Sequence, residues 1–455
     1  MQLLDLNRTR EIGASSIFAR IGPFNILFDA GTSPREMGFK ALPDYKRLGP
    51  IAIDLVLLSH CHLDHVGSLP FIMKQHPQAR VLMSQASHIV LPRILGNSIT
   101  VMKLQRDEFG VKEYPLYNQG DVEDLERNIL PMAFGKSRTL RKGNEDITIT
   151  FYSAGHVVGA SSILIEYKHQ KLFYTGDVCF RNQRTLPGAK WPKGKVDVVI
   201  TETTRGSTER KPGVTAESEI SRLINSIGMT LANGGSVLIP SFAFGRMQEI
   251  LKIINNARKE KKLPAHTPVF CSGLGYGLID DFDLINKKIS GVDFKKKNLK
   301  DLKIRILRNN DPIALRKEIK EPSLFVLSSG MLTENTSAYH AAAALAEDPK
   351  NSIYFVGFCD ESTPGYALQQ TSRGNMFMFS SHHLNVRVNA TIDRFDLSGH
   401  ANREEILKNV LNLSPRSVVL VHGEEESRNW FMDNFIESSP KTQIYDMDPC
   451  QMYTI

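Results

Sequence analysis

Four candidate metal ligands lie within six residues of this chain, in the run His60-Cys61-His62-Leu63-Asp64-His65. The run directly follows an apolar segment, residues 54–59, which predicts a buried strand. On an extended segment, residues i and i+2 face the same way, so His60 and His62 point together and Cys61 points away. Imidazole nitrogen and carboxylate oxygen both suit zinc. The run therefore predicts a metal site at the end of a strand.

Two metal ions would use this many ligands, and further ligands must then come from elsewhere in the chain. Asp64 and His65 follow at a turn and can reach a second metal position, since two metals about 3.5–4 Å apart can share a bridging oxygen. Three more polar residues stand next to glycine at predicted strand ends: His156, Asp177 and His422. A lone histidine at such a place is usually structural. The recurrence at three strand ends favours a shared site.

The elements that must position these residues follow two different patterns. The N-terminal part is strand-rich, with strands expected at Ser16–Arg20, Asn25–Asp29, Ile147–Tyr152, Ser162–Tyr167, Lys171–Tyr174 and Val196–Thr201 and a helix at Ala86–Leu104. After Glu202, helices and strands alternate at Thr215–Ala232, Ser236–Pro240, Gly245–Lys259, Pro268–Cys271, Ser323–Leu327, Ser337–Ala346 and Ser352–Phe358. Such alternation predicts a parallel sheet covered by helices.

The strand-rich pattern returns after about residue 385, which indicates one domain interrupted by another. There we expect strand Val386–Leu397, helix Asn402–Leu413, strand Ser417–Val421 and a helix near Arg428–Ile436. The expected divisions are residues 1–205 and 386–455 for the interrupted domain and 206–385 for the inserted one.

The metal-ligand motifs occur in the order of a known superfamily. The pattern HxHxDH, followed by a distant Gly-His, a Gly-Asp and a late His, resembles the metallo-β-lactamase superfamily. The segments Thr201–Gly206, Leu397–Ala401 and Leu420–Glu424 are similar to those of the β-CASP nucleases, which include the endonuclease subunit of the eukaryotic cleavage-and-polyadenylation machinery and its prokaryotic relatives. The resemblance spans essentially the whole chain. It implies an α/β fold: a metallo-β-lactamase αββα sandwich with an inserted α/β β-CASP domain, a parallel sheet flanked by helices.

The resemblance also implies a role for each matching residue. It assigns two Zn²⁺ ions, one held by His60, His62 and His156, the other by Asp64, His65 and His422, with Asp177 bridging them. Asp29 matches a residue that holds the ligand loop from behind. Glu202 matches the acidic residue of the inserted family, and His400 its catalytic histidine; with Asp64 they form the expected catalytic set.

The implied reaction is hydrolysis of RNA phosphodiester bonds by a metal-bridging hydroxide. Zinc lowers the pKa of bound water from 15.7 toward about 7. His400 is the candidate donor of a proton to the leaving ribose oxygen. His400 precedes an expected helix, and the N-terminus of a helix disfavours the imidazolium form of a histidine. A nearby carboxylate favours that form, and Glu202 could supply it, which is a physical reason for the two residues to be paired. The alternative for His400 is an ordinary residue at a helix start.

The inserted domain carries candidate phosphate-binding segments at two strand ends. Pro240–Arg246 and Ser328–Met331 each join a strand to a helix start, where free N–H groups bind anions. They place Ser241, Arg246, Ser329 and Gly330 as candidate substrate ligands, with simple helix capping as the alternative. The sequence departs from the family at Cys271–Gly275, where relatives often have Asp-Ser-Pro, and at Thr204-Arg205, where Thr-Tyr is frequent. These departures leave the details of substrate recognition open.

Charge adds a weaker signal. The net charge is +7 and the pI about 9.0. Residues 287–320 hold twelve Lys or Arg against four acids, which is either a solvated face or a phosphate-contact zone. No stretch approaches the roughly 20 apolar residues of a membrane helix, and residues 1–13 lack the apolar core of a signal peptide. Five cysteines stand singly, which favours a reducing, cytoplasmic compartment.

The preferred hypothesis is a zinc-dependent ribonuclease in RNA processing or decay, acting on single-stranded RNA as an endonuclease, a 5′ exonuclease or both. A DNA nuclease of the same fold and a catalytically silent RNA-binding subunit are the alternatives; the second is disfavoured because every metal ligand is present. A small-molecule hydrolase of the lactamase kind is disfavoured by the inserted domain and the Glu202/His400 pair. A homodimer is one option for the oligomeric state.

Overall fold

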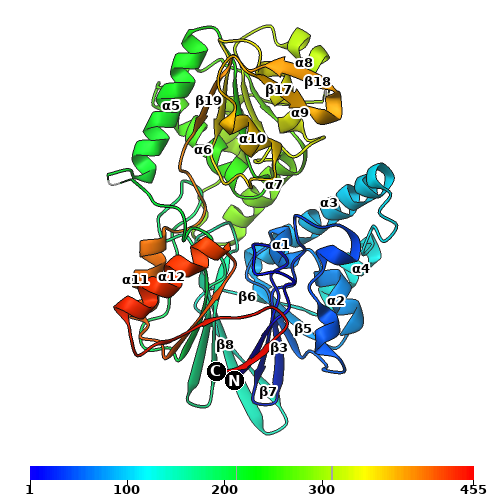
Figure 1. Ribbon diagram of the computed structural model, residues 1–455, viewed down its shortest axis with the longest axis vertical. Helices are drawn as coiled ribbons and strands as arrows, with labels where there is room; N and C mark the ends of the chain where they lie inside the picture. The colour runs from blue at the N-terminus through cyan, green and yellow to red at the C-terminus, as the bar shows by residue number, and fades with distance from the viewer. Residues whose placement is uncertain (212, 309–310) are drawn as a thin grey trace. The chain divides into compact units, whose positions relative to one another are not determined.

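The computed structural model of the chain describes residues 1–211, 213–308 and 311–455. These residues form two compact units (Figure 1). The first unit comprises Met1–Asn182, Pro187–Arg210 and His400–Ile455, and the second comprises Gln183–Leu186 and Lys211–Gly399. The expected interruption of one domain by another is therefore observed in the course of the chain.

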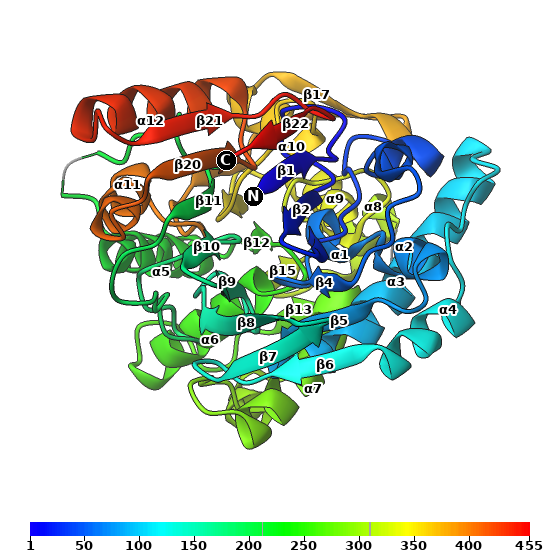
Figure 2. The same cartoon turned by 90° about the horizontal axis from the view of Figure 1, so that it is seen from below.

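Two seven-stranded sheets form the first unit. The first sheet has the order β22-β1-β2-β3-β4-β5-β6, with β1 Gln2–Asp5, β2 Ile17–Ile21, β3 Phe24–Phe28, β4 Leu55–Leu57, β5 Arg80–Ser84, β6 Ile129–Met132 and β22 Met452–Thr454. The second has the order β21-β20-β11-β10-β9-β8-β7, with β7 Ser137–Lys142, β8 Glu145–Ser153, β9 Ser161–Tyr167, β10 Gln170–Tyr174, β11 Val198–Glu202, β20 Ser417–Val421 and β21 Gln443–Asp446. The termini lie side by side because β1 pairs with β22 (Figure 2).

The core of the first unit lies between these two sheets. Ile26 and Leu57 from one sheet and Phe151, Ile163 and Ile200 from the other belong to a single buried cluster, as alternating apolar positions on facing sheets require. Helices lie outside: α3 packs beside β5 and β6, and α12 beside β20 and β21. The helices are α1 Leu63–Val66, α2 Leu69–Gln75, α3 Gln85–Phe109, α4 Gln119–Asp124, α11 Arg403–Asn412 and α12 Glu425–Ser438, with 3₁₀ turns at Gly38–Ala41, Tyr45–Leu48 and Leu125–Arg127.

A six-stranded, wholly parallel sheet forms the second unit, in the order β14-β13-β15-β12-β16-β19. Its strands are β12 Val237–Pro240, β13 Val269–Cys271, β14 Ile304–Ile306, β15 Leu324–Leu327, β16 Ser352–Phe355 and β19 Thr391–Arg394, and a separate hairpin pairs β17 Met376–Phe379 with β18 Leu384–Arg387. The helices are α5 Ala216–Ala232, α6 Arg246–Lys259, α7 Gly273–Lys288, α8 Pro312–Glu318, α9 Ser337–Leu345 and α10 Pro364–Gln370, with 3₁₀ turns at Lys296–Leu302 and Ser380–His382. The prediction of an α/β sandwich with an inserted parallel α/β unit is confirmed.

One expected element is wrong. Val386–Leu397 is not a single strand of the interrupted domain. It holds the end of β18 and all of β19, separated where Asn389 and Ala390 donate backbone hydrogen bonds to the carbonyl of Ala346. Because β19 pairs in parallel with β16, residues up to Gly399 cluster with the second unit. Among the described residues, no helix is long and apolar enough to cross a membrane.

Candidate metal centre

Strand ends bring the metal-ligand candidates to one edge of the first unit. β10, β11 and β20 run parallel, with Tyr174 opposite Ile200 and Glu202 opposite Val421. Side chains that follow the carboxyl ends of parallel strands meet at the same edge. Asp177, Glu202 and His422 therefore come together, although they lie far apart in the sequence.

One group of three imidazoles forms around His62. The His62 Nδ1 atom lies 3.0 Å from Nε2 of His60 and 3.2 Å from Nε2 of His156. His60 is fully buried and His156 nearly so. Burial and the neighbouring imidazoles hold the pKa of His60 well below its ordinary value, so its ring is neutral, the form that binds a metal. The three ring nitrogens thus converge on one point.

A second group combines two imidazoles and a carboxylate. Nε2 of His65 lies 3.2 Å from Nε2 of His422, and the latter atom lies 3.2 Å from Oδ2 of Asp64. Burial raises the pKa of the Asp64 carboxyl, but the neighbouring imidazoles of His65 and His422 outweigh it and hold that pKa below its usual range. Asp64 is therefore an ionised carboxylate and a candidate ligand.

Asp177 lies between the two groups. Its Oδ2 is 3.7 Å from Nε2 of His60 and 3.6 Å from Nε2 of His65, and its Oδ1 is 3.5 Å from Nδ1 of His422. Asp177 is buried, and Oδ1 has no hydrogen-bond partner among the described residues. An unpartnered buried carboxylate oxygen is costly unless a cation occupies the space beside it. Ring nitrogens of the neighbouring imidazoles lie close to one another around this carboxylate. Imidazole nitrogen and carboxylate oxygen are ligands that divalent zinc prefers, so these residues fit a metal centre.

Asp29 holds the ligand run from behind. It adopts a left-handed conformation with φ of 60° and is fully buried. Its Oδ2 accepts hydrogen bonds from His65 Nδ1 at 2.8 Å, the Ser59 hydroxyl at 2.7 Å and the Tyr174 hydroxyl at 2.7 Å, and its Oδ1 accepts from the Ser59 backbone N–H at 2.6 Å. A carboxylate on the far nitrogen of a ligating histidine fixes its tautomer and raises its basicity.

Sequence reasoning missed Ser59 and Tyr174, although a signal was present for each. Ser59 directly precedes the ligand run, and Tyr174 is the last residue of a strand that ends three residues before Asp177. A polar residue at the end of an apolar strand facing a buried carboxylate is a candidate hydrogen-bond donor. Ser59 follows β4 and Tyr174 ends β10, so only the three-dimensional meeting of these strand ends with Asp29 reveals both partners.

Thr204 supports His422 in the same way and was also missed. The Thr204 Oγ1 atom lies 3.0 Å from Nδ1 of His422 and 3.2 Å from its carbonyl oxygen. His422 has a positive φ of 52°. The backbone of the next residue, Gly423, lies so close to Thr203 that a Cβ on Gly423 would be only 2.2 Å from Thr203 Oγ1. The turn that presents His422 therefore requires this glycine and the threonine segment after β11.

Glu202 and His400 form a hydrogen-bonded pair beside the metal ligands. Nδ1 of His400 donates to Oε2 of Glu202 at 2.9 Å, while Oε1 accepts from the Val178 N–H at 2.6 Å. The His400 ring centroid is 4.5 Å from that of His156. Burial lowers the pKa of His400, but the Glu202 carboxylate outweighs it, so the net shift is upward. The Glu202 carboxylate therefore favours the protonated form of His400, whose Nε2 faces away from Glu202.

The substrate-ligand candidates lie in the second unit, at strand ends. Ser241 follows β12, is buried, and donates to the carbonyl of Ile239 at 3.3 Å. Ser329 follows β15, and its Oγ accepts from the Thr333 N–H at 3.1 Å, which is a turn-capping role. A Cβ at Gly330 would lie 2.9 Å from the Phe242 nitrogen, so the two strand-end loops pack closely.

Arg246 opens helix α6 and is buried; its Nη2 donates to Oε1 of Gln183 at 3.1 Å. It thus contacts the short segment Gln183–Leu186 that belongs to the second unit.

The basic region 287–320 is partly neutralised by acids in the fold. Ion pairs join Lys287 to Asp283 at 2.6 Å and Arg305 to Glu321 at 3.4 Å. Arg316 pairs with Glu347. The high local charge of the sequence therefore overstates the free positive charge of this surface.

Family models match most of the chain in three consecutive pieces. The metallo-beta-lactamase superfamily model matches residues 9–223, the Beta-Casp domain model residues 247–368, and a model described as a Zn-dependent metallo-hydrolase RNA specificity domain residues 385–444.

Several curated proteins are similar over most of this chain. Cleavage and polyadenylation specificity factor 73 of Drosophila melanogaster is 28% identical over 436 residues, which cover 93% of this chain and 60% of that protein. Endoribonuclease ysh1 of Schizosaccharomyces pombe is 26% identical over 434 residues, covering 93% and 54%. The RNase J-like protein of Methanocaldococcus jannaschii is 29% identical over 427 residues, covering 91% and 90%. The chain thus spans little more than half of these eukaryotic relatives but nearly all of the archaeal one.

A solved structure supports the fold alone. The crystal structure of a protein of unknown function from Enterococcus faecalis V583 aligns over 100% of this chain and 99% of that chain, with a TM-score of 0.57 and 14% sequence identity.

Proposed function

We propose that this chain, which belongs to the metallo-β-lactamase superfamily and carries its β-CASP domain, is a metal-dependent ribonuclease that hydrolyses phosphodiester bonds in RNA. The observation that carries the proposal is the Glu202–His400 pair beside a cluster of seven metal-ligand candidates. A cluster of this kind supports hydrolysis in general. The positioned acid suits a reaction whose leaving group is an alkoxide that needs a proton.

Two zinc ions are the proposed metals. His60, His62 and His156 would hold one and Asp64, His65 and His422 the other, with Asp177 shared between them; their donor atoms lie within 4.8 Å of one another in overlapping groups. Divalent ions at these positions would lower the pKa of a water molecule and neutralise charge on the scissile phosphate.

The remaining roles belong to the chain's own side chains. Asp29 orients His65, and Thr204 orients His422, so that their Nε2 atoms face the centre. Glu202 holds His400 through Nδ1 and stabilises its imidazolium. Nε2 of His400 is then the atom that gives a proton to the leaving ribose oxygen.

The substrate is proposed to be single-stranded RNA. The relatives that share the domain order include proteins named as endoribonucleases and as RNase J-like, and the third matched model is described as an RNA specificity domain. Ser241, Arg246, Ser329 and Gly330 are retained as proposed phosphate contacts. Five free cysteines support the proposal of a reducing, cytoplasmic compartment.

The test separates metal binding from proton donation. We expect His400→Ala to retain wild-type zinc content and to cleave RNA about 10²–10⁴-fold more slowly. His88→Ala is the matched control, because His88 also pairs with a glutamate, Glu126 at 2.8 Å, but lies outside the ligand cluster. Cleavage by His400→Ala at the rate of the control would refute the assignment. RNA labelled at either end would distinguish released mononucleotides from internal fragments.

A further inference from the structure

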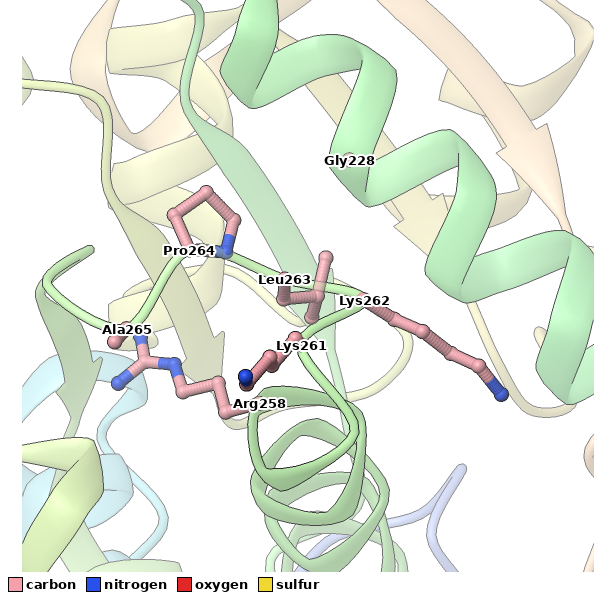
Figure 3. Close-up of a pocket in the computed structure, with 7 residues that line it drawn as sticks. All are labelled: Gly228, Arg258, Lys261, Lys262, Leu263, Pro264 and Ala265. Carbon is pink, nitrogen blue, oxygen red and sulfur yellow. The ribbon is translucent and has the colours of Figure 1, made fainter.

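A basic run closes helix α6 in the second unit, at the end of the helix opposite Arg246. The run Arg258-Lys259-Glu260-Lys261-Lys262 holds four cations in five residues. It borders a cavity of about 530 Å³ that is open to solvent (Figure 3). Its described lining residues include no acid: Gly228, Arg258, Lys261, Lys262, Leu263, Pro264 and Ala265. A volume of this size holds a nucleotide rather than a single ion.

Arg258 is a buried cation that has no acidic partner in the described part of the chain. Its side chain is 8% exposed. Nη1 donates to the carbonyls of Asp301 at 3.3 Å and Leu302 at 3.4 Å, and Nη2 donates to that of Thr267. Nε has no hydrogen-bond partner among the described residues. Carbonyl dipoles satisfy part of the guanidinium but do not neutralise it, and an uncompensated buried charge is costly. An anion in the adjoining cavity would supply the missing charge.

Lys261 is the second cation of the site. Its backbone has a φ of 58°, the left-handed position after a helix that glycine usually fills. Figure 3 shows the side chains of Arg258 and Lys261 extending to the same side of the loop, whereas Lys262 extends the other way. Lys262 is already paired with Glu260 at 2.7 Å. Lys261 is thus an exposed cation that can bind the same anion as Arg258.

We propose that this cavity binds one nucleotide of single-stranded RNA, with Arg258 and Lys261 holding its phosphate and Leu263 and Pro264 contacting its ribose or base. The assignment of RNA as the ligand rests on the proposed ribonuclease function. The assignment of a phosphate-binding site does not depend on that function, because it follows from Arg258 and Lys261 themselves. The site belongs to the second unit, whereas the metal ligands all belong to the first. It would therefore strengthen RNA binding without taking part in the chemical step.

The test uses the full-length protein with a fluorescent single-stranded RNA, with cleavage suppressed by the His400→Ala substitution in every sample. Lys261→Gly removes the charge and suits the left-handed backbone, so the fold is spared. Gly228→Met fills the cavity from α5 without changing any charge; the first added carbon would lie 3.9 Å from Leu263 Cδ2. Lys259→Ala is the matched control, since Lys259 belongs to the same run but does not line the cavity.

We expect Lys261→Gly to reduce the slope of log affinity against log salt by about 0.7, the value for one phosphate contact on a single strand. Gly228→Met should weaken binding roughly threefold or more at unchanged slope, and Lys259→Ala should change little. Equal affinities and slopes for all variants would overturn the site while leaving the ribonuclease proposal intact. No RNA binding by the parent would overturn the RNA ligand and the proposed function together. Inorganic phosphate that binds the RNA-free protein only when Lys261 is present, at matched ionic strength, while RNA affinity is the same with and without Lys261, would mark a site for free phosphate and overturn the nucleotide assignment.

Discussion

Removing a single hydroxyl behind the metal centre should weaken metal binding without touching a ligand. Tyr174 is buried, and its phenol donates to Oδ2 of Asp29 at 2.7 Å. Burial and the negative charge of Asp29 raise the pKa of this phenol well above 10, so it remains a donor at every working pH. Tyr174→Phe deletes the hydroxyl and preserves the shape of the core.

The magnitude follows from what Asp29 loses. A hydrogen bond to a charged group contributes about 1.5–3 kcal/mol, and about 1.4 kcal/mol corresponds to a tenfold change in affinity. Oδ2 keeps its bonds from His65 and the Ser59 hydroxyl, so the loss should lie at the low end. We expect zinc affinity to fall about tenfold, within the range of roughly 10–100-fold for partners of metal-bound histidines.

The assay is competition for zinc against a chromogenic chelator, with unfolding in urea measured in parallel. Tyr354→Phe is the matched control, because its buried hydroxyl bonds Thr230 Oγ1 at 2.9 Å in the second unit. Both variants should lose similar stability, and only Tyr174→Phe should lose zinc affinity. Equal zinc affinities for Tyr174→Phe and wild type would refute the idea that Asp29 transmits this contact to His65.

Two further substitutions test contacts that the fold makes at a distance in sequence. Thr204→Val removes the partner of His422 Nδ1 and should lower zinc affinity about tenfold; an unchanged affinity in the same chelator assay would show that the turn alone fixes His422. Glu249→Ala should loosen the attachment of the segment Gln183–Leu186. The Glu249 carboxylate accepts hydrogen bonds from Arg184 N at 2.6 Å, Thr185 N at 2.9 Å and Thr185 Oγ1 at 2.8 Å. Each buried donor left unsatisfied costs about 1–3 kcal/mol. Limited proteolysis should then cut within this segment, and resistance equal to wild type would contradict the anchoring role.

The sequence predicted the fold class and the grouping of the ligand candidates because both depend on local patterns. The spacing of His60 and His62 places both side chains on one face of an extended segment, and the glycines beside Asp177 and His422 mark turns at strand ends. The family resemblance then joined ligands that lie hundreds of residues apart. None of this needed knowledge of packing between the sheets.

What the sequence did not predict depends on contacts between distant strands. Tyr174 carries no motif, and Thr204 lies in a family-like segment that assigns it no contact with His422. Each acquires its role only where β10 or the segment after β11 meets a candidate ligand or its support. The segment Val386–Leu397 is predicted as one strand, yet backbone hydrogen bonds to Ala346 divide it. Its second half pairs with β16 in the parallel sheet of the second unit. The charge of residues 287–320 was visible, but its pairing with Asp283, Glu321 and Glu347 was not.

The most direct test of metal-dependent RNA cleavage is a titration of chelator-stripped protein with zinc, in which bound metal and the rate of RNA cleavage are measured on the same samples. We expect no cleavage without metal and a cleavage rate that rises with zinc occupancy until two zinc ions are bound per chain. Cleavage by the metal-free protein at the full rate would contradict a metal-dependent mechanism. A variant in which His60, His62 and His156 are all replaced by alanine and which still cleaves RNA at the wild-type rate would contradict it as well.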